Sequence, residues 1–239
     1  MNITLNDSLF TVNNQFKIGL IHYNKIIVEE SPQMIKGRTQ LYQENLFFEL
    51  QETPVTERDG IKEWRQVWKA FGADPNRYRH SAESLMRRIA KQNYLTPVHS
   101  AVDLNNFFSL QYEIPIGIYD TAQLEGAIEI ALGDEETGYE GLNGRYNSLQ
   151  NIVHSKDARD AFGSPFVDSK RTATSEQTTD ALQIRSDPYQ NCPVLLWRTP
   201  GCGTQLRLLC YRIWNTFPDR WSTRPWPLSA NFRPHPGMR

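Results

Sequence analysis

Apolar residues recur along the chain with two periods, and each period predicts one kind of secondary structure. In FKIGLIHY, residues 16–23, every second position from Phe16 through Ile18 to Leu20 is apolar. Successive side chains of a strand point to opposite faces, so this alternation predicts a strand with one face more buried than the other. The pattern of residues 33–52 predicts a helix, and a loop is expected after it.

The segment KEWRQVWKAFG, residues 62–72, is typical of an amphipathic helix. Its large apolar residues fall at helical spacing: Trp64, Val67, Trp68 and Phe71. Gly72 follows them, and glycine commonly ends a helix because it adopts the left-handed backbone conformation without strain. A further helix is expected in SAESLMRRIAKQN, with Ser81 as N-cap and with Glu83 in the first turn, where a negative charge suits the helix dipole.

Basic residues gather on this second helix and on its approach. They are Arg77, Arg79, Arg87, Arg88 and Lys91. Residues 1–184 carry 8 Lys and 10 Arg against 25 acidic residues, so this is the one concentrated basic surface of a region with a net charge of −7. A solvated helix face explains such a run most simply. The alternative is a contact to nucleic-acid phosphates, and these five residues are the candidates for it.

The segment VDLNNFFSLQYEIPIGIYD, residues 102–120, predicts a helix followed by a strand. On a helix, Asn106 shares a face with Val102 and Leu110, which predicts a buried amide. An unpaired buried amide costs ~1–3 kcal/mol, so Asn106 needs a partner. That partner is either a nearby backbone group or a ligand in a cavity, into which Asn105 and Asn106 would point together.

The strand of this segment has one face that carries little bulk. Pro115, Gly117 and Tyr119 share that face, and a glycine within a strand often marks close approach by a ligand or by another backbone. We therefore expect room for a small ligand beside it. The later segment AFGSPFVDSKRT offers a second polar wall of Gly163, Ser164, Asp168, Arg171 and Thr172, for which turn capping and a surface ion pair are the alternatives.

Composition changes abruptly at Arg185. Residues 185–239 hold all 3 cysteines, 8 of the 14 prolines, 8 Arg and 2 Asp, but no Lys. Prolines interrupt most of this segment, and only residues 205–216 leave space for a short helix or strand. We expect a poorly ordered tail, either the product of a shifted reading frame or a basic aromatic arm that binds nucleic acid.

Chain-wide features exclude several classes of protein. The 239 residues are 39% hydrophobic and 22% charged, which is typical of a globular protein with a substantial core. The chain has no run of 18 apolar residues, so no membrane span is predicted. The N-terminus lacks a secretory signal, so a cytoplasmic location is expected. The cysteine and histidine spacings fit no common zinc site, and neither a metal nor another cofactor is expected.

VDLNNFFSLQYEIPIGIYD resembles a segment of the B3/B4 domain, which is part of the β subunit of bacterial phenylalanyl-tRNA synthetase and also occurs in freestanding proteins. FGADPNRYRHSAESLMRR is similar to a run in the freestanding proteins, and LEGAIEIALGDEE and DSKRTATSEQTTDALQI extend the resemblance to about residues 60–184. It implies an α+β fold of mixed sheets with flanking helices. Residues 1–184 would form one such domain, with an N-terminal strand–helix extension.

The resemblance also implies an activity. In the synthetase this domain hydrolyses the ester of wrongly charged tRNA, and freestanding members resemble trans-acting editing factors. The family's mechanism uses a hydroxyl of the terminal ribose and an ordered water. That agrees with a chain that has no G-x-S-x-G motif and no cysteine before Cys192. The expected enzyme is an aminoacyl-tRNA deacylase of protein biosynthesis, with the tRNA acceptor end as partner and no DNA.

Carried over residue by residue, the resemblance places Asn106 on the family's pocket asparagine and Asn105 beside it, as the candidate catalytic residues. Gly117 stands where the synthetase has a histidine, which implies a wider pocket. Ile184 falls near the synthetase's selective glutamate, so recognition of a tyrosine hydroxyl is not implied. Candidates for substrate binding are Pro115, Gly117, Tyr119, Gly163, Ser164, Asp168, Arg171 and Thr172.

Two alternatives remain open from the sequence. The first is a non-catalytic module that binds RNA or an amino acid, although the acidic balance of residues 1–184 weakens affinity for phosphates. The second is an inactive copy, in which the altered tail replaces the final strand and helix that family members have. The sequence indicates neither the edited amino acid nor the oligomeric state.

Overall fold

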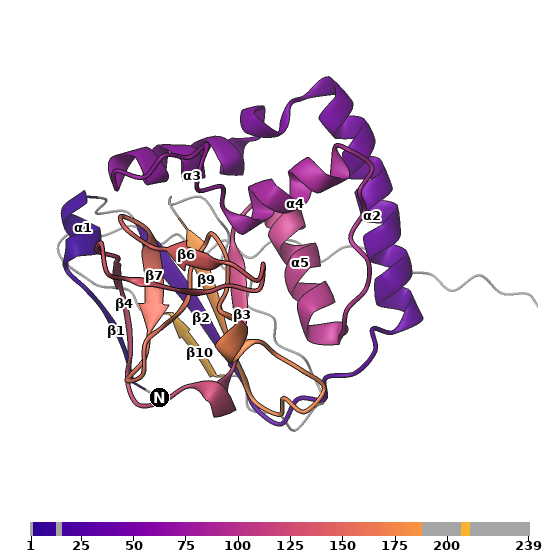
Figure 1. The fold of residues 1–239 in the computed structure, drawn as a ribbon. Coiled ribbons are helices and arrows are strands. Elements are labelled where there is room, and N and C mark those ends of the chain that lie inside the picture. Colours follow the sequence, from indigo (N-terminus) through magenta and orange to yellow (C-terminus); the bar gives the residue numbers. More distant parts are fainter. Residues whose placement is uncertain (1, 13–15, 188–206, 211–239) are drawn as a thin grey trace, which may run out of the picture.

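The computed structural model describes residues 2–12, 16–187 and 207–210, and over these residues the protein has an α+β fold (Figure 1). Two four-stranded sheets lie beside a group of helices. The α-helices of the described residues are α1 (Ser8–Val12), α2 (Gln33–Glu52), α3 (Asp59–Ala70), α4 (Ser81–Ile89) and α5 (Ser100–Tyr112). Short 3-10 helices lie at η1 (Val55–Glu57), η2 (Thr121–Gln123) and η3 (Lys170–Thr172).

The first sheet has the strand order β1–β4–β7–β8. Its strands are β1 (Ile3–Leu5), β4 (Ile128–Leu132), β7 (Val153–Lys156) and β8 (Ala161–Gly163). β1 runs parallel to β4, whereas the other two pairs are antiparallel. Between β4 and β7 the chain forms a separate antiparallel hairpin of β5 (Gly138–Glu140) and β6 (Tyr146–Ser148).

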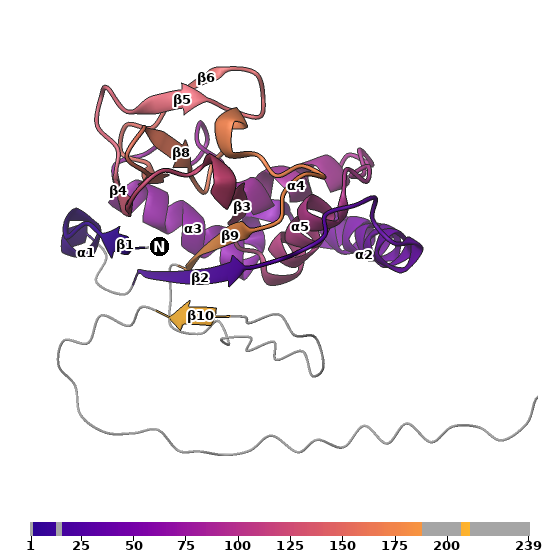
Figure 2. The same cartoon turned by 90° about the horizontal axis from the view of Figure 1, so that it is seen from below.

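The second sheet has the order β10–β2–β9–β3 and is antiparallel throughout. Its strands are β2 (Lys17–Tyr23), β3 (Ile116–Asp120), β9 (Ala181–Asp187) and β10 (Arg207–Cys210). The register places Ile184 of β9 between Leu20 of β2 and Gly117 of β3. Figure 2 shows β10 on the side of β2 that faces away from β9. Strands from both ends of the described chain therefore complete this sheet.

Two apolar clusters hold the elements together. The larger lies among the sheets and α3 and includes Phe16, Ile18, Leu20, Trp64, Trp68, Ile130, Phe162 and Leu182. The smaller lies among α2, the start of α3, α4 and α5, and includes Leu46, Leu50, Ile61, Met86, Ile89 and Leu110. In Figure 1, α4 and α5 separate α2 from the sheets. Because the sheets share the larger cluster, their facing strands hold each other in fixed positions.

Most of the elements expected from periodicity are present. The strand at residues 16–23 corresponds to β2, and the helix at 33–52 corresponds to α2. The aromatic stripe of α3 is buried, and Gly72 follows that helix with φ of +87°. One expectation was wrong by a residue: His80 is the N-cap of α4, while Ser81 is its first residue and makes no capping bond, because the turn begins one position earlier.

The domain boundary expected at residue 184 falls inside β9, which continues to Asp187. β10 lies within the stretch 205–216 that was expected to permit a short element. The remainder of the expected irregular tail lies outside the described residues. No helix in the described part of the chain is long and apolar enough to cross a membrane.

Candidate functional site

Helix α5 and strand β3 form one side of the site. The helix begins after His99, whose imidazole accepts a bond from the Val102 amide at 3.4 Å. It ends at Glu113, which adopts a left-handed conformation with φ of 58°. The Glu113 carboxylate in turn accepts a bond from the Gly60 amide at 3.0 Å, which fixes the turn against α3. β3 is thereby held against the helix that precedes it.

The buried amide of α5 belongs to Asn105, which corrects the expectation for Asn106. The Asn105 side chain is 7% exposed and donates to the Ile116 carbonyl at 2.7 Å. It also accepts from Gln183 of β9 at 2.9 Å, so it joins the helix to two strands. Asn106 is only half-buried, and its amide has no hydrogen bond within the described residues. The error arose because the two residues differ by only about a quarter turn of the helix.

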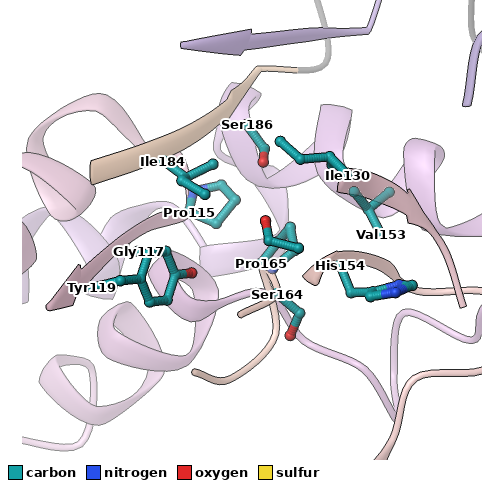
Figure 3. A pocket seen from close by; sticks show the side chains of 11 residues that line it. Pro115, Gly117, Tyr119, Ile130, Val153, His154, Ser164, Pro165, Ile184 and Ser186 are labelled. Atoms are coloured by element: carbon teal, nitrogen blue, oxygen red, sulfur yellow. The ribbon is translucent and has the colours of Figure 1, made fainter. Parts of the chain in front are cut away.

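A small cavity lies between the two sheets. β3 and β9 line it from one sheet, and β4, β7 and the loop after β8 line it from the other (Figure 3). Its apolar lining includes Pro115, Ile130, Val153 and Ile184. The cavity volume is about 10 Å³, which is enough for ordered water and too small for an aminoacyl group.

The strand face that was expected to be bare is covered by Tyr119. The phenol of this residue lies against both Gly117 and Gly163, and a Cβ added to either glycine would overlap its oxygen. Its ring packs edge-on against Phe162 at a centroid distance of 4.9 Å, and the residue is 3% exposed. The two glycines therefore admit a side chain of the protein itself, which corrects the expected open pocket.

Asp168 receives the Tyr119 phenol. The Tyr119 hydroxyl donates to the Asp168 carboxylate at 2.6 Å. Burial raises the pKa of Asp168 to about 7, although hydrogen bonds from Tyr119 and from the Ser164 backbone oppose the rise. Burial also raises the pKa of Tyr119 well above its usual value, so the phenol keeps its proton. The pair therefore forms a carboxyl group that changes charge near neutral pH beside a neutral hydroxyl.

Ser164 belongs to a second hydrogen-bonded group in the same loop. Its hydroxyl donates to the Val167 carbonyl at 2.9 Å and receives a bond from the Tyr139 hydroxyl at 3.0 Å. Burial raises the pKa of Tyr139, which also stays neutral. Ser164 thus has no basic partner that would activate it as a nucleophile.

The sequence interpretation missed three polar residues at the cavity: His154, Ser155 and Ser186. The two serines are buried, and their hydroxyls have no hydrogen-bond partner within the described residues. In Figure 3 the Ser186 hydroxyl points toward the centre of the cavity, whereas the His154 ring turns away from it. Strand alternation gave the available signal, because Ser155 follows Val153 and Ser186 follows Ile184 at a spacing of two.

Arg171 and Thr172 lie outside the cavity. Arg171 donates to Asp157 at 3.0 and 3.1 Å and to the carbonyls of Gln123 and Asp160. Thr172 is fully buried, and its hydroxyl is 3.5 Å from the Phe162 carbonyl. Of the expected wall of residues 163–172, Ser164 therefore lines the cavity, whereas Gly163 and Asp168 contact the Tyr119 phenol. Arg171 and Thr172 belong to a structural part that follows.

The five basic candidates differ in what they contact. Arg87 donates to the fully buried Glu83 at 2.9 Å, and Glu83 also binds Arg65 of α3 at 3.1 Å. Arg77 is exposed and lies over the Tyr78 ring at 5.1 Å. The other three are exposed and have no ion pair within the described residues: Arg79, Arg88 and Lys91.

The approach to α4 connects these cations to the cavity. The Tyr78 ring packs edge-on against Phe166 at 5.4 Å, and the Ser81 amide donates to the Pro165 carbonyl at 2.7 Å. Pro165 and the adjacent Ser164 line the cavity. The exposed arginines at 77 and 79 therefore flank the loop that bounds the cavity. No group of His, Cys, Asp and Glu within the described ranges could hold a metal ion.

Comparison with known proteins identifies the family. The model of the B3/4 domain family matches residues 63–184, which contain α5, β3, β9 to Ile184 and the loop of Asp168. The uncharacterized protein YhzB of Bacillus subtilis (strain 168) is 31% identical over 156 residues, which cover 64% of this chain and 75% of that protein. An N-terminal fragment of the phenylalanyl-tRNA synthetase β-subunit from Pyrococcus horikoshii aligns with a TM-score of 0.37 and 10% identity. That alignment covers 77% of this chain and 42% of the fragment. By the family match, which covers about half of its residues, the chain belongs to the B3/4 domain family.

Proposed function

We propose that this protein hydrolyses the ester bond of mischarged aminoacyl-tRNA and acts in trans to the synthetase that made the error. The observation that carries this proposal is the serine-lined cavity, whose lining residues lie inside the region of the family match apart from Ser186. Its volume suits ordered water, and Ser155 and Ser186 offer it unpaired hydroxyls. An aminoacyl ester is already activated, so a positioned water and polar donors supply much of what its hydrolysis requires.

The proposed reaction uses no protein nucleophile. Ser164 donates to a backbone carbonyl, and the neutral Tyr119 and Tyr139 keep their protons at physiological pH. The attacking group would be a water held by Ser155 and Ser186. As its oxygen bonds to the ester carbonyl, the free ribose hydroxyl of the substrate would take up a proton from the water and pass its own proton to the departing ribose oxygen, so the ester C–O bond breaks to give the free amino acid and the deacylated tRNA. The aminoacyl ester would lie over the mouth of the cavity, because the interior is too small for it.

The tRNA would reach this mouth across the approach to α4. Arg77 and Arg79 lie beside the loop of Pro165, and both are exposed. Arg88 and Lys91 continue the charge along α4. A few phosphate contacts of this kind give weak, salt-dependent binding, which suits an enzyme that engages only the acceptor end. Arg87 is a weaker candidate because the buried Glu83 already holds it.

A panel of mischarged tRNAs tests the activity directly. The expected result is release of at least one amino acid faster than in buffer. Ser186→Ala and Ser155→Ala should each lower the rate about tenfold or more while the melting temperature stays unchanged. Thr53→Ala, which removes an exposed hydroxyl at the end of α2, is the matched control. Failure to release any amino acid from any tRNA would contradict the proposal.

The two asparagines provide a second test. Asn105→Ala leaves the buried Gln183 amide and the Ile116 carbonyl unpaired, so it should lower the free energy of unfolding by ~1–3 kcal/mol. Asn106→Ala should change that free energy by less than ~1 kcal/mol because no bond is lost. A loss of turnover in Asn106→Ala without a loss of stability would assign Asn106 to the substrate. Unchanged turnover in that variant would remove it from the site.

The exposed cations on the approach to α4 also favour a second candidate function, a module that binds RNA without hydrolysis. Filter binding of uncharged tRNA across a salt series separates the two. Tight, salt-sensitive binding that Arg79→Ala weakens, without deacylation, would favour the binding module. Arg145→Ala removes an exposed cation on the β5–β6 loop and serves as a control of equal charge.

A further inference from the structure

A row of aromatic and basic side chains leads from the cavity over the approach to α4. It begins at Phe166, which follows the cavity residues Ser164 and Pro165 in the chain. Phe166 is half-buried and belongs to neither apolar cluster. The Tyr78 ring lies 5.4 Å from the Phe166 ring, and the Arg77 guanidinium lies over the Tyr78 ring at 5.1 Å. Phe166, Tyr78 and Arg77 together make up the aromatic row.

Hydrogen bonds hold both turns that carry the aromatic row. In the first turn, the Ser164 hydroxyl donates to the Val167 carbonyl at 2.9 Å and accepts from the Val167 amide at 3.2 Å. In the second, the Asp74 carbonyl accepts from the amides of Arg77 and Tyr78 at 3.1 and 2.8 Å. A surface that is already held in place loses little conformational freedom when it binds a partner.

The aromatic row has ring faces and polar groups that the described part of the protein does not use. The planes of Phe166 and Tyr78 meet at 81°, so the ring that contributes its edge keeps both of its faces free of its partner. Within the described residues the Tyr78 hydroxyl makes no hydrogen bond and the exposed Arg77 makes no ion pair. Single-stranded RNA binds to such surfaces because its bases stack on aromatic rings and on guanidinium planes.

The place of the aromatic row at the cavity indicates which base it would meet. In the proposed reaction the ester lies over the mouth of the cavity, and the last ribose of the tRNA carries that ester. Its base therefore lies within one nucleotide of Ser164 and Pro165, which line the cavity in Figure 3. Phe166 is the next residue along this loop, and the exposed Arg79 lies beyond Tyr78 in the chain.

We propose that the aromatic row is a stacking platform for the terminal base of the tRNA acceptor end. This inference rests on the proposed function for the identity of the RNA. Stacking uses the face of a base and not its hydrogen-bonding edge, so the platform accepts the base without reading its sequence. It orients the last ribose so that the ester lies over the cavity, while exposed cations such as Arg79 attract the phosphates.

Binding of a short uncharged single-stranded RNA with the sequence of a tRNA 3′ end tests the platform, beside the same RNA without its terminal base. The parent protein should bind the intact RNA at least about fivefold more tightly, as is typical of one base stacked on an aromatic ring. Phe166→Leu keeps most of the apolar volume but removes the ring. It should weaken binding of the intact RNA about fivefold or more and change binding of the abasic RNA little, at an unchanged melting temperature.

Two further variants check that the ring itself is responsible. Phe166→Tyr keeps an aromatic face and should bind the intact RNA as the parent does. Phe48→Leu removes a ring that is 68% exposed on α2, away from the cavity, and is the matched control. Salt then separates stacking from phosphate contact: Phe166→Leu should leave the salt dependence of the affinity unchanged, whereas Arg79→Ala should reduce it.

Equal binding by Phe166→Leu and the parent overturns the proposal. So does a loss of the same size for the intact and the abasic RNA, and so does a parent that binds neither. Deacylation by the parent, together with unchanged RNA binding in Phe166→Leu, would reject the platform and retain the proposed function. Binding that depends on Phe166, without deacylation of any mischarged tRNA, would retain the platform and reject the hydrolase.

Discussion

Asp157 and Asp168 lie on the same stretch of chain, yet the structure gives them opposite properties. Asp157 receives two bonds from Arg171 and backbone bonds from Glu125, Arg159 and Asp160. Burial alone would raise its pKa, but these bonds outweigh it and lower the pKa to about 2. Asp168 has Tyr119 as its side-chain donor, and burial raises its pKa to about 7.

The difference lies in the number and charge of the donors. A guanidinium and three amides stabilise the ionised form of Asp157, so that region serves as a brace between the loop after β7 and η3. At Asp168 the neutral phenol and the Ser164 backbone do not compensate the loss of solvation of the carboxylate. A carboxyl group that titrates near neutral pH beside a cavity is typical of a functional site, whereas a saturated ion pair is typical of a structural one.

The largest expected effect concerns the brace. Arg171→Leu leaves the Asp157 carboxylate without its cation, and breaking a buried pair costs roughly 3–5 kcal/mol. Chemical denaturation should therefore show a large loss of stability. Arg159→Leu is the control, because that side chain is more than half exposed and only 3.7 Å from an exposed glutamate. Similar losses in the two variants would contradict the assignment.

Asp168→Asn should have the opposite sign. Because the folded pKa of Asp168 is raised, its stability contribution is present at low pH and is lost as pH rises toward about 7. The neutral amide avoids that loss, so at about pH 8 the variant should be more stable than the parent by up to roughly 4 kcal/mol. The advantage should shrink as pH falls from 7 to 4. Glu176→Gln, at an exposed carboxylate, should show no such trend.

His80 sharpens this pH comparison, since it titrates in the opposite sense. It is fully buried between α3 and the start of α4, and neither ring nitrogen has a hydrogen-bond partner in the part of the chain that the structure describes. Burial, with the nearby Arg65 charge, lowers its pKa to about 3. Its contribution is present above pH 6.5 and is lost on acidification, by about 2 kcal/mol at pH 5. His80→Leu, with a similar volume, should remove this acid loss. If His80→Leu loses as much stability on acidification as the parent does, His80 is protonated in the folded protein.

Tyr119→Phe should have the smallest effect. It removes one hydrogen bond, for which about 1 kcal/mol is typical. Because that bond lowers the pKa of Asp168, the pKa should rise above its present value of about 7. An NMR titration of the carboxyl carbon measures this shift. Tyr146→Phe, at a tyrosine that is 70% exposed, is the control. A lower pKa in Tyr119→Phe would mean that Tyr119 does not stabilise the charged form.

The sequence predicted those parts of the fold that depend on a strong local period. The aromatic stripe of α3 and the alternation of β2 each have one apolar face, so their positions and inner faces were predicted correctly. The pairing of Glu83 with Arg65 could not be predicted, because Arg65 comes from another helix. A glutamate in a first helical turn was interpreted as a response to the helix dipole, and its burial was missed.

The site was predicted in its location and less well in its detail. Helix α5 carries apolar residues around much of its circumference, so the pattern did not show whether Asn105 or Asn106 faced inward. The strand face with little bulk at Gly117 was recognised. The sequence does not show which rotamer Tyr119 adopts, and its ring turns back over that glycine. Ser155 and Ser186 were missed because they come from different sheets, and the sequence does not show that these sheets face each other across a cavity.

Strands near the start of the chain have a consequence for how this domain can be cut. The family match begins at residue 63, yet β1 pairs with β4 and β2 lies between β9 and β10. A recombinant fragment trimmed to the matched borders would expose the unpaired backbone of two strands and would tend to aggregate. Expression of this domain therefore requires its first two dozen residues. The region of recognisable homology is shorter than the unit that folds.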